Sequence, residues 1–123
     1  MKNDKEKFKT ELKNRIYKWI LQLIKFLDAL PKDNTTNIIS AQLLRSGTSI
    51  GANYIEAQSV SSKKDFTNFF HHALKSSDES KFWLFILRDT NKGPKTEAEN
   101  LLRELIEIAN ILASSILTLK RKK

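Results

Sequence analysis

The amino-acid sequence predicts an all-α protein, an antiparallel four-helix bundle with up-down-up-down connections. Apolar residues recur at alternating intervals of three and four along most of the 123 residues, which is the spacing of amphipathic helices. Only three glycines and two prolines interrupt the chain, so its elements should be few and long. We expect one domain over residues 1–123, with helices at about 5–30, 35–59, 63–90 and 96–121 joined by short loops.

The first predicted helix carries one apolar stripe. Its members lie three or four residues apart and should face the core together: Phe8, Leu12, Ile16, Trp19, Leu23, Phe26 or Leu27, and Leu30. Pro31 ends this helix, because proline lacks a backbone N–H and disfavours helical backbone in the residue before it.

The second predicted helix has a centre of small residues, 46-SGTSIGA-52. Thr35 or Thr36 should cap its N-terminus. The residues expected in the core are Ile38, Ile39, Leu43, Ile50 and Tyr54. Glycine costs about 1 kcal/mol relative to alanine inside a helix, so a break in this centre is the alternative. We predict a continuous helix, because the apolar spacing stays in register on both sides.

The third predicted helix begins at Ser61 or Ser62, where a hydroxyl cap is followed by Asp65 in the first turn. It should end before 91-NKGP-94, in which glycine and proline occupy positions that commonly follow a helix.

The fourth predicted helix begins near Thr96 and ends in the basic tail 120-KRKK-123, as the helix dipole favours. It carries two apolar stripes, Leu101, Leu105, Ile108, Leu112, Ser115 and Leu119, and beside them Leu102, Ile106, Ala109, Ala113 and Ile116. One stripe is sufficient for a bundle helix, so the second is available to a neighbouring molecule.

The run 82-FWLFIL-87 in the third helix wraps most of the helix circumference. At least two of Phe82, Trp83, Phe85 and Ile86 should therefore lie outside the core of the single chain. Contiguous exposed apolar residues usually mark an interface, which favours a homo-oligomer. The alternative is that the wide stripes fill a thick core.

The composition carries a formal net charge of +8 and no cysteine. A disulfide or thiolate metal site is excluded, and a cytoplasmic protein is expected. No window approaches the roughly 18 uninterrupted apolar residues of a membrane span, so no membrane partner is expected. The candidate contacts to RNA or DNA backbone are Lys13, Arg15, Lys18, Lys120, Arg121, Lys122 and Lys123. Solvated helix ends explain these charges equally well.

No catalytic, metal or cofactor site is predicted, so we expect a protein that is not an enzyme. His71 and His72 are adjacent, and adjacent helical positions point about 100° apart, so both cannot bind one metal. The segment 46-SGTSIG-51 lacks the lysine and hydroxyl residue of a phosphate-binding loop.

A polar stripe follows one face of the second helix through Arg45, Ser49, Asn53 and Glu56. It is either a contact for a ligand or nucleic acid, or a hydrogen-bonded network that fixes the packing, and the network is favoured. Glu79 of the third helix is the expected partner of Arg45.

The segment 42-QLLRSGTSIGANYIEAQSVSSKKDF-66 resembles the signature of the bacterial 23S ribosomal RNA intervening-sequence proteins. The matching residues are Gln42, Arg45, Ser46, Ser49, Ile50, Asn53, Glu56, Ala57, Lys64, Asp65 and Phe66, followed by Ala73, Lys75, Glu79, Ser80, Phe82, Trp83 and Leu84. Ser76 stands where the family has an acid, and Phe82 where it has tyrosine.

The resemblance implies an antiparallel four-helix bundle, often assembled as a ring-shaped homopentamer, with no established enzymatic activity. A related branch, the accessory variability determinant proteins of diversity-generating retroelements, implies basic pentamers that bind nucleic acid and a reverse transcriptase. We therefore expect a pentameric protein that binds RNA or DNA backbone without reading bases. The alternative is a protein–protein adaptor that uses the apolar residues around Trp83.

Overall fold

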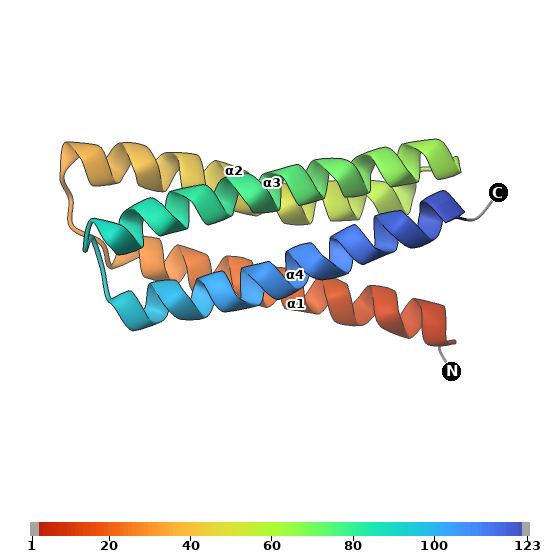
Figure 1. Cartoon of the computed structure of the whole chain (residues 1–123), viewed down its shortest axis with the longest axis horizontal. Coiled ribbons are helices and arrows are strands. Elements are labelled where there is room, and N and C mark those ends of the chain that lie inside the picture. Colours follow the sequence, from red (N-terminus) through yellow and green to blue (C-terminus); the bar gives the residue numbers. More distant parts are fainter. Residues whose placement is uncertain (1–2, 122–123) are drawn as a thin grey trace.

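The computed structural model describes residues 3–121 and contains the four predicted helices. They are α1 (Asp4–Asp28), α2 (Asn34–Ser59), α3 (Lys63–Asp89) and α4 (Lys95–Arg121). Consecutive helices run in opposite directions, so α1 begins and α4 ends at the same end of the molecule (Figure 1). The prediction of an antiparallel four-helix bundle is confirmed.

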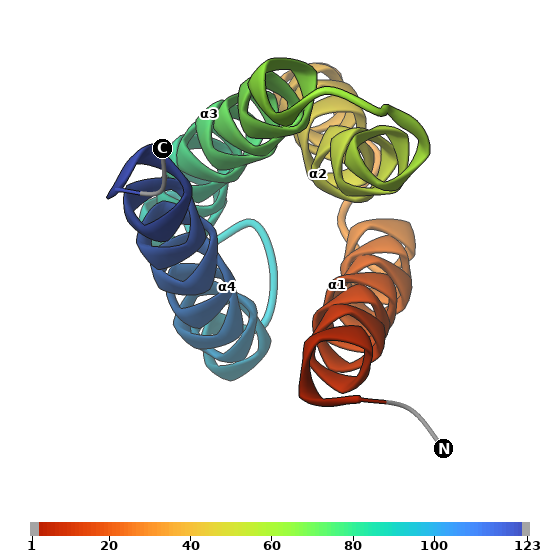
Figure 2. The ribbon, with the colours of Figure 1, turned by 90° about the vertical axis from the view of Figure 1, so that its right-hand side faces the viewer.

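Each helix packs against the helices next to it in the chain, and α4 packs against α1. α1 and α3 therefore lie on one diagonal of the bundle, and α2 and α4 on the other. α2 and α3 pack most closely, whereas α1 packs more loosely on both of its neighbours. At the end where α1 begins and α4 ends, these two helices diverge (Figure 2). We call this end, which also holds the connection between α2 and α3, the open end.

The cap of α3 agrees with the prediction, and the cap of α2 does not. Ser62 Oγ accepts a hydrogen bond from the backbone N–H of Asp65 at 3.1 Å. α2 is capped by Asp33, whose Oδ1 accepts from the backbone N–H of Thr36 at 2.8 Å. The predicted cap at Thr35 or Thr36 is thus wrong, because a carboxylate just before the helix interacts more favourably with the helix dipole. The bond to Thr36 lowers the pKa of Asp33.

α3 ends in a left-handed turn at Asn91, whose φ is 56°. The backbone N–H of Lys92 donates to the carbonyl oxygen of Leu87 at 3.0 Å and closes the turn. The sequence suggested Gly93 as the residue that ends the helix. Asparagine takes that place because its short polar side chain tolerates the left-handed conformation.

α2 is continuous through its small central residues, as predicted. Gly47 and Gly51 lie against α1. A Cβ atom on Gly47 would lie 2.5 Å from Leu23 Cδ2 and 3.2 Å from Trp19 Cζ3. A Cβ atom on Gly51 would lie 2.9 Å from Ile20 Cδ1. The two glycines permit this close approach of α1, which offsets their unfavourable helix propensity.

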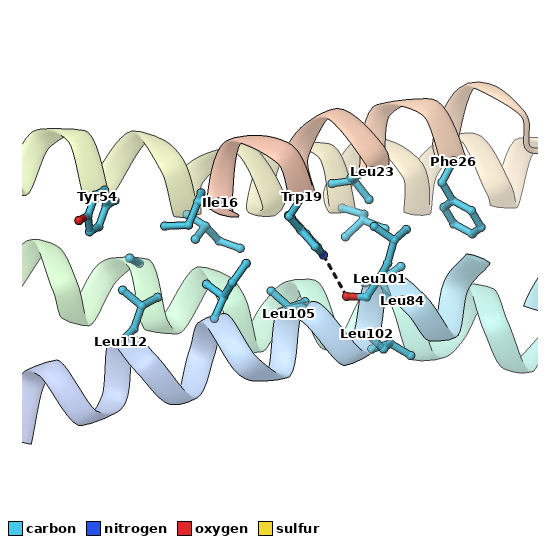
Figure 3. Packing of buried hydrophobic residues seen from close by; sticks show 14 of the residues in the cluster. Ile16, Trp19, Leu23, Phe26, Tyr54, Leu84, Leu101, Leu102, Leu105 and Leu112 are labelled. Carbon is cyan, nitrogen blue, oxygen red and sulfur yellow. Dashed lines mark hydrogen bonds between the residues drawn. The ribbon is translucent and has the colours of Figure 1, made fainter. Parts of the chain in front are cut away.

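Trp19 joins α1 to α4 at the centre of the core (Figure 3). Its side chain is 1% exposed, and its Nε1 donates a hydrogen bond to the carbonyl oxygen of Leu101 at 2.9 Å. Leu23, Leu84 and Leu105 are fully buried in the same hydrophobic cluster. The predicted stripe of α1 is buried from Leu12 to Leu30.

Two residues that were expected in the core are exposed. Phe8 is 47% exposed, because it lies on the first turns of α1, where α4 has moved away. Ile38 is 56% exposed, because its neighbour Ile39 takes the inward direction and adjacent helical residues point about 100° apart.

Both apolar stripes of α4 are used within the bundle. The buried members are Leu101, Leu102, Leu105, Ile108, Ala109, Leu112 and Ile116. Ile106 is 41% exposed. The alternative of a thick core is therefore correct for α4, and this helix offers a neighbouring molecule less surface than the sequence suggested.

Candidate functional site

Arg15, a predicted nucleic-acid contact, is held by two carboxylates of α4. Its Nε lies 3.0 Å from Glu104 Oε2, and its Nη2 lies 2.6 Å from Glu104 Oε1. The same Nη2 lies 2.7 Å from Glu107 Oε2. These bonds raise the pKa of Arg15 and lower that of Glu104, chiefly through their mutual hydrogen bond. The guanidinium therefore joins α1 to α4 and is not a free charge for a phosphate.

Two groups of predicted basic contacts lie far apart along the bundle. Lys13 and Lys18 are exposed on α1, at the level of the Arg15 contacts. Lys120 and Arg121 are exposed on the last turn of α4, roughly 20 Å further along at 1.5 Å per residue. Lys122 and Lys123 lie outside the described residues. Lys13 and Lys18 therefore do not form one basic surface with Lys120 and Arg121.

A different set of basic residues gathers at the open end. Residues 3–9, 56–65 and 118–121 meet there and carry seven basic and four acidic side chains. We call these three segments the basic end. This cluster could have been predicted from the sequence, because an antiparallel bundle brings the starts of α1 and α3 and the end of α4 together.

The predicted pairing of Arg45 with Glu79 is present, and Trp83 joins it. Arg45 Nη2 donates to Glu79 Oε2 and to Gln42 Oε1, the latter at 3.0 Å. Trp83 Nε1 donates to the same Glu79 oxygen at 3.0 Å. The side chains of Arg45 and Glu79 are 56% and 36% exposed, so the cluster lies at the surface. Glu79 thus connects the polar stripe to the apolar run of α3 by fixing the orientation of Trp83.

The remaining stripe residues bond mainly within their own helix. Ser49 Oγ donates to the carbonyl oxygen of Arg45 at 2.8 Å, and Asn53 Nδ2 donates to that of Ser49 at 2.8 Å. Ser49 and Asn53 line a shallow depression of about 750 Å³ together with His72 and other residues of α3. Glu56 is exposed. The polar stripe is therefore only partly a link between helices.

The buried polar contact between α2 and α3 is one that the sequence analysis missed. Ser46 and Ser80 are 1% and 0% exposed, and their Oγ atoms lie 2.8 Å apart. Their small size lets these two helices pack more closely than any other pair. Both residues belong to the segments that resemble the family signature. Their small side chains were the sequence feature that could have indicated this close contact.

Two of the four residues predicted as an interface are exposed, as expected. Phe82 is 55% exposed and Phe85 is 39% exposed, whereas Trp83 and Ile86 are half-buried. The ring of Trp83 packs edge-on against Phe82 at a centroid distance of 5.0 Å. These four residues form the α3 patch.

A second exposed apolar surface lies on α1 and was not predicted. Tyr17, Leu21 and Ile24 are 62%, 49% and 38% exposed. Their spacing of four and three places them on one face of the helix, which we call the α1 patch. Because α1 and α3 lie diagonally across the bundle without direct packing, the α1 patch and the α3 patch face opposite sides.

A larger groove opens at the basic end. It has a volume of about 850 Å³ and lies between the first turns of α1, the α2–α3 connection and the last turns of α4. Tyr54, at its base, is 2% exposed, and its hydroxyl donates to the carbonyl oxygen of Lys9 at 3.0 Å. Burial raises the pKa of Tyr54 to about 12.

Replacing Arg15 with alanine should lower the free energy of unfolding by about 1 kcal/mol at neutral pH, since the group is partly exposed. A carboxyl group with a lowered pKa stabilises the fold above its unfolded pKa and loses this effect as pH falls through its folded pKa. The unfolded pKa of Glu104 is about 4.5, so the difference between Arg15→Ala and wild type should shrink below that pH. Urea unfolding at neutral pH and at about pH 3 measures this, with Lys18→Ala as control. An equal loss at both pH values would contradict the role of Glu104.

Within residues 3–121, no group of three or more His, Asp or Glu side chains is arranged to hold a metal ion. His71 is half-buried and His72 exposed, and the ring of His72 packs edge-on against Phe69 at 6.2 Å. None of the four helices is both long and apolar enough to cross a membrane, as far as the described residues go.

Comparison with known proteins identifies a family and structural relatives, of which one is described below. The family model described as 23S rRNA-intervening sequence protein matches residues 9–114. A crystal structure of a protein of unknown function from the S23 ribosomal protein family of Bacteroides thetaiotaomicron is 31% identical, with a TM-score of 0.81. The similarity covers 88% of this chain and 96% of that one. No curated protein matches the sequence. Since the family model spans most of all four helices, the chain belongs to the 23S rRNA-intervening sequence protein family.

Proposed function

We propose that this protein is a cytoplasmic, non-enzymatic homo-oligomer, a ring of about five copies, that binds RNA or DNA backbone through its basic end. The observation that carries the assembly is the pair of apolar patches on opposite sides of the bundle. An interface between the α1 patch of one copy and the α3 patch of the next is heterologous. Such interfaces generate a ring when the rotation that relates neighbouring copies returns to the first copy. The number five comes from the family resemblance.

The basic end supports the nucleic-acid part of the proposal. Cyclic symmetry puts the equivalent end of every copy at the same height on the ring axis, so the excess positive charge repeats around one collar. Such a collar attracts phosphate backbones through a sequence-independent electrostatic term. The proposed contacts are the basic residues of the basic end, with Lys120 and Arg121 among them, whereas Lys13 and Lys18 lie further along α1 and Arg15 is held by its carboxylates.

The first test is the mass in solution by light scattering. We expect a species near five times 14.2 kDa for the wild type. Phe82→Asp and Leu21→Glu should each abolish this species, whereas Ile38→Asp, equally exposed but outside both patches, should not. Mixing the Phe82→Asp and Leu21→Glu proteins should give a dimer, because each retains one intact patch. Absence of that dimer from a mixture of folded monomers would contradict a heterologous interface.

The second arm adds a generic single-stranded RNA to the wild-type oligomer. Binding should weaken steeply with salt, because phosphate contacts release counterions. Lys120→Glu with Arg121→Glu should weaken it further, while Lys25→Glu with Lys32→Glu, the same charge change at the other end, should have a smaller effect. Binding that is indifferent to salt would contradict the backbone mode.

A protein–protein adaptor is the second candidate. The exposure of Phe82 next to Trp83, which Glu79 holds in place, favours it. A wild-type protein that remains a folded monomer and ignores RNA would support an adaptor that uses the α3 patch for a different protein.

A further inference from the structure

The groove at the open end has an unusual lining for a surface that no part of the described chain covers. Its walls include Phe8 from α1, Phe66 and Phe70 from α3, and Ile111 and Leu119 from α4. Phe8 continues the core stripe of Leu12 and Ile16 by helical spacing, yet it remains 47% exposed. The groove is therefore an extension of the core in which one side has no packing partner.

The aromatic base of the groove is fixed in place. Phe66 and Phe70 stack with ring centroids 4.8 Å apart, and Tyr54 packs on Phe70 at 5.6 Å. The Tyr54 hydroxyl is already bonded to the carbonyl oxygen of Lys9, so the rings offer a mainly apolar surface. Pockets of this kind, apolar with a few polar groups at one side, are typical of small-molecule sites.

The charged side chains that line the groove are all positive among residues 3–121. They are Lys5, Lys9 and Lys63, and no aspartate or glutamate of this described part of the chain lines the groove. The other polar residues are hydroxyl side chains and Asn110. An occupant complementary to this surface has an apolar body and an anionic head.

The dimensions favour a small amphiphile over a helix. The wall from Asn110 to Leu119 is about 14 Å long at 1.5 Å per residue. A wall of this length contacts only about two and a half turns of a helix, and isolated helices that short are marginally stable in water. The groove's volume of about 850 Å³ lies inside the usual range for small-molecule pockets.

We propose that this groove binds a long-chain carboxylate, with its alkyl chain against Phe8, Phe70 and Ile111 and its carboxylate beside Lys5 and Lys9. This site is independent of the two apolar patches, but Lys5 and Lys9 also belong to the basic end that we propose to contact nucleic acid. Burying the chain gains free energy in proportion to its apolar surface, and the lysines select the negative head over a positive one.

Calorimetric titration of the full chain with dodecanoate below its micellar concentration tests the site. We expect one dodecanoate per chain, and about tenfold weaker binding of dodecyltrimethylammonium, which has the same alkyl chain and the opposite charge. Equal affinity for both, or no saturable dodecanoate binding, would overturn the proposal. Light scattering of the same sample separates this result from the assembly proposal, because either one can fail alone.

Two variant pairs locate the site. Ser114→Trp fills the groove from its exposed edge and should abolish dodecanoate binding, whereas Asn100→Trp, on the opposite end of α4, should not. Lys5→Glu with Lys9→Glu should weaken binding about tenfold, and Lys18→Glu with Lys25→Glu, an equal charge change elsewhere on α1, should not. Folding of each variant is checked by circular dichroism. Binding that Ser114→Trp leaves intact, or binding only to anionic phospholipid vesicles, would overturn the groove assignment.

Discussion

Replacing Trp19 with alanine should lower the free energy of unfolding by about 4 kcal/mol, a large part of the stability of a domain of this size. Trp19 is 1% exposed and is a principal connection of α1 to the bundle. Its ring packs under Gly47 of α2, and its Nε1 bonds to the Leu101 carbonyl of α4. The substitution therefore opens a cavity between three helices and removes a buried hydrogen bond at once.

Two further tryptophan variants separate these contributions. Trp19→Phe retains most of the packing and loses the hydrogen bond, so it should cost about 1–2 kcal/mol. Trp83→Ala, at a half-buried position on α3, should cost less than Trp19→Ala. The measurement is urea unfolding followed by circular dichroism at one protein concentration, because association changes apparent stability. A loss for Trp19→Ala no larger than that for Trp83→Ala would contradict the central place of Trp19.

The fold was predictable because its signals are local. Helical spacing, Pro31 and the Ser62 cap each depend on a few neighbouring residues, and all agree with the structure. The resemblance drawn from residues 42–66 is confirmed by the family match over residues 9–114. The wrong cap at Thr35 or Thr36 reflects a competition that sequence patterns do not decide, since Asp33 and the threonines are all good caps.

The candidate sites were less predictable because they depend on relations between helices. The sequence does not show that Glu104 and Glu107 form ion pairs with Arg15, because these residues lie about ninety positions apart in the chain. The exposure of Phe8 depends on the divergence of α1 from α4, which the apolar pattern does not contain. The Arg45–Glu79 pair was predicted on the premise that an unpaired buried charge is costly, whereas the structure has this pair at the surface.

The loose packing of α1 connects the stability of the fold with its candidate surfaces. α1 contributes the α1 patch, one wall of the groove and part of the basic end, yet it packs less closely than the other helices. Its attachment depends on Trp19, the Arg15 ion pairs and the glycines of α2. Substitutions that loosen α1 should therefore disturb assembly and groove binding together, so both measurements need variants whose unfolding free energy is unchanged.

Replacing Gly47 with valine should lower the free energy of unfolding by about 2–3 kcal/mol, because it overfills the contact between α1 and α2. A Cβ atom at this position would lie 2.5 Å from Leu23 Cδ2, and Leu23 is fully buried in the core. Gly47→Ala should be milder, since the gain in helix propensity of about 1 kcal/mol opposes the clash. Ala52→Val, at an exposed position of the same helix, measures the effect of the helix propensity of valine without the contact to Leu23. Urea unfolding of the three variants gives the comparison.

A double-mutant cycle with Leu23→Ala decides whether the clash has the predicted origin. Leu23→Ala alone should be destabilising, because it removes a buried side chain. Combined with Gly47→Val, it should recover at least about 1 kcal/mol relative to the sum of the single effects, because the valine enters the space that Leu23 has left. Strict additivity would mean that the two side chains do not meet, and that α1 does not lie against the glycine face of α2. Recovery would identify Gly47 as the residue that sets the distance between α1 and α2, and hence the position of the α1 patch.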